Sequence, residues 1–113
     1  MRMRTLLFFA LVAMIPAAQV RAEEAAMDGP AAKAFMQANQ AMMDDMMAPN
    51  LTGDPDKDFA TMMIPHHEGA IAMAKVVLQY GDDPDIRALA ESIVKSQSDE
   101  VQWMKDWLAK QPK

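Results

Sequence analysis

The stretch that decides the fold runs from residue 54 to residue 81 and reads DPDKDFATMMIPHHEGAIAMAKVVLQYG. It begins with Asp54-Pro55, a capping carboxylate followed by a proline suited to the first turn of a helix. Its last residue is Gly81, which is typical of a left-handed helix terminator. Between them, side chains suited to one buried face recur at steps of three and four: Phe59, Met63, His66, Ala70, Met73 and Val77. The stretch therefore predicts a helix over residues 55–80.

Two further helices are predicted, one before this helix in the chain and one after it. The first covers residues 30–48, and the third covers residues 84–109 after a second Asp-Pro start signal. The third helix has its own apolar stripe: Ile86, Leu89, Ile93, Val94, Val101, Met104 and Leu108. Because the connections are short, neighbouring helices must run antiparallel. The sequence thus predicts an all-α, antiparallel three-helix bundle over residues 30–113, which could close alone or dimerise into a larger bundle.

The N-terminus has the layout of a secretory signal peptide. Arg2 and Arg4 precede an apolar run over residues 6–15, and small residues lead up to a cleavage site between Ala22 and Glu23. The run is about half of the roughly 20 residues that a membrane-spanning helix needs, so an uncleaved anchor is the less favoured alternative. We therefore expect an exported protein, periplasmic or secreted, that has no membrane attachment after cleavage.

The composition after that cut is acidic and rich in methionine. Residues 1–22 hold three of the 11 basic residues and no acidic one, which leaves 8 basic and 16 acidic side chains, a net charge of −8. Such a chain favours a cation over nucleic acid or an anionic lipid surface. Ten of the 13 methionines remain, and the absence of cysteine means that packing alone must hold the domain. Residues 23–29 are acidic and small, and we expect them to form a flexible lead-in.

Both histidines of the chain lie side by side in the central helix, among methionines. Helical geometry puts Met63 one turn before both His66 and His67. Met62 lies one turn before His66, and Met73 lies two turns after it on the same side. Imidazole and thioether groups can thus converge from a single helix, and His66 is the favoured ligand because it shares a helix side with these three methionines.

Two other features support a site in this segment. Pro65 has no N–H for the preceding turn, so the helix should kink there. Gly69 removes side-chain bulk one turn later, which would let another helix approach. In the first helix three methionines, Met36, Met43 and Met47, share a line and are further candidate ligands.

The donor types favour Cu(I) or its analogue Ag(I), because thioethers are soft and imidazole is intermediate. Zinc would require thiolate, carboxylate or more histidine. The zinc-protease motif is excluded, since Ile71 stands four residues after His67. No nucleophile–base set or phosphate loop is present, so no enzyme is expected. The competing interpretation is a helical interaction module of the cell envelope, in which the methionines fill the core and the histidines are structural.

Paired positions along the chain resemble the domain-of-unknown-function family 305 over roughly residues 33–109. They are Asp58-Phe59, Met63-Ile64, His66-His67, Ala70-Ile71 and Met73-Ala74, followed by Leu89-Ala90, Ile93, Gln97, Glu100-Val101, Met104 and Trp107-Leu108. The resemblance implies an exported protein with a ferritin-like fold of the four-helix-bundle type. It also implies that the protein binds copper or silver in the periplasm, for metal resistance, for buffering or for exchange with copper-transfer proteins.

The resemblance also implies a set of ligands. Those that match the family's pattern are Met63, His66, His67, Met73 and Met104. Many members are longer and have a second Met/His segment beyond the region where this chain stops. The candidates of the first helix, Met36, Met43 and Met47, rest on helix geometry alone.

Overall fold

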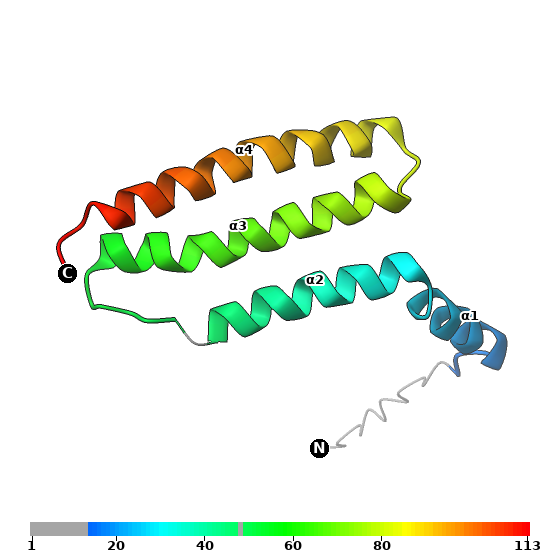
Figure 1. The fold of residues 1–113 in the computed structure, drawn as a ribbon. Coiled ribbons are helices and arrows are strands. Elements are labelled where there is room, and N and C mark those ends of the chain that lie inside the picture. The colour runs from blue at the N-terminus through cyan, green and yellow to red at the C-terminus, as the bar shows by residue number, and fades with distance from the viewer. Residues whose placement is uncertain (1–13, 48) are drawn as a thin grey trace, which may run out of the picture.

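The computed structural model describes residues 14–47 and 49–113, and its regular structure is all α-helix. The helices are α1 (Ala17–Met27), α2 (Pro30–Met47), α3 (Pro55–Tyr80) and α4 (Pro84–Ala109) (Figure 1). Helices α2, α3 and α4 run antiparallel to their neighbours, which confirms the predicted fold class.

Helix α1 was not predicted. It covers the end of the expected leader and most of the expected flexible lead-in, contributes no buried residue, and contacts α2 only. The start of the expected leader, residues 1–13, lies outside the described residues, as does residue 48 at the expected end of the first helix. Among the described residues, none of the helices is long and apolar enough to cross a lipid bilayer.

Both Asp-Pro pairs begin helices as predicted. The Asp54 carboxylate accepts hydrogen bonds from the amides of Asp56 and Lys57, at 3.0 and 3.3 Å. Asp83 caps α4 in the same way, accepting from the amides of the second and third helical residues at 3.0 and 2.9 Å. Each cap satisfies two of the amides that the first turn leaves without partners, and the proline removes a third.

The prediction of a left-handed Gly81 was wrong. Gly81 is extended, with φ −83° and ψ 148°, and its amide donates to the Val77 carbonyl at 2.7 Å. A guanidinium nitrogen of Arg87 donates to the carbonyls of Leu78 and Gly81, at 2.9 and 3.0 Å. This side chain from α4 satisfies carbonyls at the end of α3, a task that a left-handed glycine performs in other helices.

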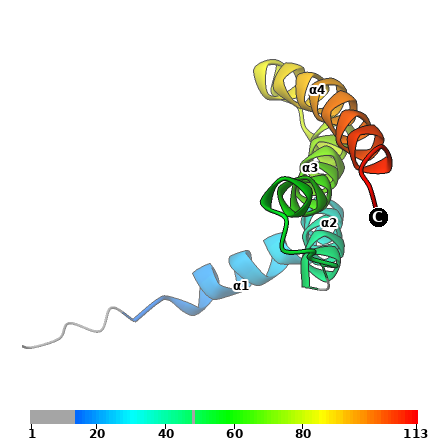
Figure 2. The same ribbon diagram turned by 90° about the vertical axis from the view of Figure 1, so that its left-hand side faces the viewer.

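Helix α3 is the middle of a layer that is one helix thick. It packs against α2 on one side and α4 on the other, whereas α2 and α4 have no Cα atoms within 8 Å of each other. Figure 2 shows the three helices in a single curved row, with α1 projecting away from α2. The layer arrangement decides which helix faces are covered.

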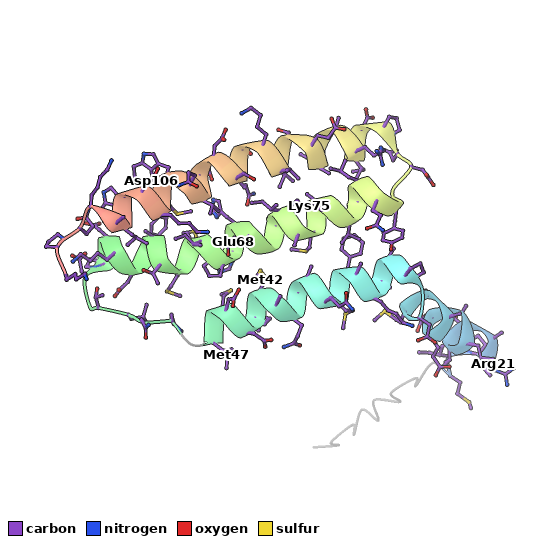
Figure 3. The ribbon with its side chains drawn as sticks, in the orientation of Figure 1. Arg21, Met42, Met47, Glu68, Lys75 and Asp106 are labelled. Atoms are coloured by element: carbon purple, nitrogen blue, oxygen red, sulfur yellow. The ribbon has the colours of Figure 1, made fainter. Side chains whose placement is uncertain are left out.

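Gly69 lets α2 approach α3, as the sequence predicted. A Cβ atom added to Gly69 would lie 2.5 Å from Sδ and 2.8 Å from Cγ of Met42. Figure 3 shows Met42 of α2 directed into the space between the two helices. Helix α3 continues without a break through Pro65.

The core is small and lies mainly between α3 and α4. Ala60, Val101 and Met104 are buried together, and partly buried apolar side chains pack on them: Met63, Ile64, Ile71, Trp107 and Leu108. The predicted stripe of α3 is not a buried face, since Phe59 and His66 are exposed. The reason is that α2 and α4 lie on the two sides of α3 and leave that stripe between them uncovered.

Asp58 attaches the loop before α3 to the first turn of that helix. Its carboxylate accepts hydrogen bonds from the amide and hydroxyl of Thr52, at 2.7 and 2.9 Å, and from the Gly53 amide at 2.9 Å. Gly53 has φ +85°, a conformation that favours glycine. The hydrogen bond from the Thr52 amide is the main reason that the pKa of Asp58 is lowered from its ordinary value of 3.8.

This geometry predicts how the loop responds to acid. A folded-state pKa below the unfolded value means that the ionised carboxylate stabilises the fold at neutral pH, and that this contribution is lost as the pH falls through the folded-state pKa. Asp58→Asn is expected to lower the melting temperature at pH 7, and its difference from the parent should shrink below about pH 4. Thermal unfolding followed by circular dichroism checks this, with the exposed Asp82→Asn as control. Identical melting of Asp58→Asn and parent at pH 7 would contradict the assignment.

Candidate metal centre

A cavity of about 360 Å³ between α3 and α4 brings together three of the predicted ligands. Met63 and His67 line it from α3, and Met104 lines it from α4. The remaining lining side chains are Phe59, Glu100 and Trp103. Two thioethers and one imidazole, supplied by two helices, thus line one apolar cavity together with a single carboxylate.

Helix periodicity positions each of these side chains. Met63 and His67 are four residues apart, so they lie one above the other on α3. Met104 is 6% exposed and belongs to the core, and Glu100 lies one turn before it on α4. The packing of α4 against α3 then brings the two pairs together.

Glu100 orients the His67 ring. Its Oε2 lies 2.6 Å from Nε2 of His67, whose side chain is 20% exposed. A ring nitrogen this close to a carboxylate oxygen must carry a proton, so in the neutral ring the lone pair lies on Nδ1. A carboxylate that holds one ring nitrogen in this way prepares the other nitrogen to bind a metal.

The other histidine lies elsewhere. His66 is exposed and does not line this cavity, because adjacent helical residues point about 100° apart. The preference for His66 rested on methionines of its own helix. The position of α4 places His67 with Met63 and Met104 instead.

The remaining candidates are dispersed. Met62 lines a second cavity between α2 and α3, together with Met46 and Glu68. Met73 lines a third cavity, next to Phe35 and Leu89. The candidates of α2, Met36, Met43 and Met47, are all exposed, and Figure 3 shows Met47 at the C-terminal end of its helix. The structure therefore brings together Met63, His67 and Met104 but not these five methionines.

Sequence reasoning missed Glu100 and Trp103 as parts of this site. Glu100 lies 33 residues from His67, so no local pattern connects them. The available signal was on α4 itself, where Glu100 is one turn before Met104 and on the same side. Trp103 was not among the predicted site residues, and its side chain is 64% exposed at the rim of the cavity.

Comparison with known proteins places the chain among relatives without an assigned activity. A family model described as "Domain of unknown function (DUF305)" matches residues 10–108. The chain is also similar to "Uncharacterized protein L153" of Acanthamoeba polyphaga mimivirus, with 43% identity over 49 residues. That match covers 43% of this chain and 32% of the relative, so the chain spans about a third of that protein. Because the family model covers nearly the whole sequence, the chain belongs to the DUF305 family.

Proposed function

We propose that this protein binds Cu(I) or Ag(I) as cargo in the groove between α3 and α4. The observation that carries the proposal is the convergence of Met63, His67 and Met104 on one cavity. Two thioethers and an imidazole form a donor set that suits these soft monovalent ions. The Nδ1 atom of His67 is the nitrogen donor, since Nε2 faces Glu100.

The charge of the site supports a monovalent ion. Thioethers and a neutral imidazole add no charge, so the Glu100 carboxylate is the one ionised group among the side chains that line the cavity. A monovalent cation next to Glu100 makes a neutral pair, whereas a divalent ion would leave one positive charge in an apolar pocket. The Glu100 side chain is 59% exposed, so water reduces the cost of the extra charge, and charge matching is a secondary support for a monovalent ion.

The position of the site suits buffering and transfer of the metal. The cavity opens at the surface beside Trp103, so an ion can enter and leave without unfolding of the helices. A copper-transfer protein could reach the metal by the same route. The N-terminal leader would direct the chain to the periplasm or out of the cell, where thioether ligands need no reducing environment to remain available. We propose no catalytic role.

The test is a competition titration of Cu(I) between a chromogenic chelator and the chain from residue 23 onward, without oxygen. This form retains the layer of α2, α3 and α4, to which α1 contributes no buried residue. We expect the chain to withdraw one equivalent of Cu(I), Ag(I) to compete for the same site, and Zn²⁺ not to compete. Failure to withdraw Cu(I) from a weak chelator, or equal competition by Zn²⁺, would contradict the proposal.

The alternative function is a helical interaction module without metal, in which the same methionines and histidines are structural. It is favoured by exposed aromatic side chains on the layer, Phe59 and Trp103. The metal titration separates the two functions, because an interaction module has no reason to bind Cu(I) one to one.

A further inference from the structure

One face of the helical layer is apolar and uncovered. Its exposed large side chains come from all three helices: Phe35 of α2, Phe59 of α3, and Ile86, Leu89 and Trp103 of α4. Phe59, Ile86, Leu89 and Trp103 are between 51% and 65% exposed, far more than core residues of these types. We call the surface formed by these five residues the open face.

Two cavities show that these residues lie on the same side of the layer. Phe35, Ile86 and Leu89 line one cavity together with Met73 and Val77 of α3. Phe59 and Trp103 line the other cavity together with Met63. The α3 residues that line these cavities belong to one stripe at steps of three and four, so the open face runs along the helix, with the exposed His66 as one polar side chain within it.

The opposite face of the layer is polar. Lys105 pairs there with Glu68 at 2.7 Å, and Glu68 lies about half a turn around α3 from the stripe of the open face. The side chains that line these two cavities, and a third cavity lined by Phe59 and Trp103 near the start of α3, include two carboxylates. One is Glu100, which pairs with His67, and the other is Asp56 near the start of α3.

The exposed apolar area has the size of an interface. With aromatic and large aliphatic side chains of ordinary size, the five residues leave on the order of 500 Å² of apolar surface open on each copy. A standard interface takes about 800 Å² from each partner, of which a little more than half is apolar. The exposed apolar area of the open face is therefore about as large as the apolar area that each copy buries in a stable dimer.

We propose that the open face binds a second copy of this chain, so that two three-helix layers close face to face around a shared core. The inference goes beyond metal binding and does not depend on it. Because Phe59 and Trp103 also line the metal cavity, the dimer would cover the opening, and the ion would enter and leave through the monomer. A two-fold dimer of this kind uses the same patch on both copies. A second copy presents an open face of the same helix length and the same apolar width. Few carboxylates lie on this face, so charge repulsion between the two copies is small there. The open face has no charge pattern by which one foreign partner would be selected.

Sedimentation equilibrium of the chain from residue 23 onward, with a metal chelator present, tests the proposal over about a hundredfold range of concentration. We expect twice the chain mass at the upper end. Raising the salt concentration should strengthen association, because it screens repulsion between chains of net charge −8 while leaving apolar contacts intact. A parent that is monomeric throughout would overturn the proposal and leave the open face to a foreign partner.

Substitutions on the open face sharpen the test. Ile86→Lys and Leu89→Lys should each give a monomer with unchanged helix content, because both side chains are more than half exposed in a single copy. Ala88→Lys is the matched control, since it adds the same charge at an exposed position on the same helix. It should leave the dimer intact. Dimers that survive both substitutions on the open face, or that are lost equally in Ala88→Lys, would overturn the proposal.

A fluorescence measurement tests where the copies meet. In a Trp107→Phe background the tryptophan emission comes from Trp103 alone, since the chain has two tryptophans. Its quenching by acrylamide should fall as the protein concentration rises through the range in which the dimer forms. A dimer in which Trp103 stays as accessible as in the monomer would mean that another surface forms the interface, and would overturn the proposal.

Discussion

Replacing Met63 and Met104 together by leucine is expected to lower the Cu(I) affinity of the chain at least about a hundredfold. Leucine nearly conserves the volume of methionine but has no sulfur to donate, so each substitution should change stability by less than about 1.5 kcal/mol. Competition titration and urea unfolding of the same protein measure the two effects separately. The matched control is the double substitution Met43→Leu and Met47→Leu, which removes two exposed thioethers from α2.

The adjacent histidines provide a second pair of matched variants. His67→Ala should weaken Cu(I) binding at least about tenfold, whereas His66→Ala should leave it unchanged. Glu100→Gln keeps a hydrogen-bond acceptor for Nε2 of His67 but removes the compensating charge, so it should have an intermediate effect. If His66→Ala or the α2 control weakened binding as much as the cavity variants, the assigned ligand set would be wrong.

Gly69→Ala is expected to destabilise the fold by about 1–3 kcal/mol, although alanine is the better helix former. The added Cβ would lie 2.5 Å from Met42 Sδ and 3.0 Å from Met42 Cβ, so more than the flexible end of that side chain must move. Urea unfolding measures the change in the free energy of unfolding.

Truncating the Met42 side chain should remove most of this destabilisation. In a Met42→Ala background the contacts with Sδ and Cγ are gone and only the close approach to the Cβ of residue 42 remains, so Gly69→Ala should cost much less than in the parent. The double-mutant cycle therefore isolates the contact between α2 and α3. If Gly69→Ala changed the stability of the parent and of the Met42→Ala variant equally, the two helices would not be in close contact at this point.

Three of the four helices in the described residues, and the starts of α3 and α4, were predictable from local patterns. Asp54 and Asp83 begin helices because a carboxylate can reach amides two and three residues ahead, and the proline that follows each one fits the first turn. The role of Gly69 was predictable for a similar reason, since a missing side chain in a helix leaves space for a neighbour. The end of α3 was not predictable in this way, because Arg87 of the next helix donates hydrogen bonds to the carbonyls there.

The composition of the candidate site was only partly predictable. The sequence indicated thioether and imidazole donors in one helix, and Met63 and His67 are among the residues that line the cavity. Helix periodicity alone favoured His66 and grouped it with Met73, because both lie on the central stripe of α3. That stripe faces the open side of the layer, and Met73 lines a different cavity.

The sequence by itself determined three of the four described helices, a methionine-rich chain with two adjacent histidines, and a glycine at a helix contact. These features depend on interactions within about one helical turn, which can be read from the order of residues. Only the tertiary structure decided that α2 and α4 lie on opposite sides of α3, that His67 rather than His66 meets Met104, and that Glu100 holds the ring. The physical reason is that each of these depends on the side of α3 from which another helix approaches, which is set by packing between segments distant in the chain.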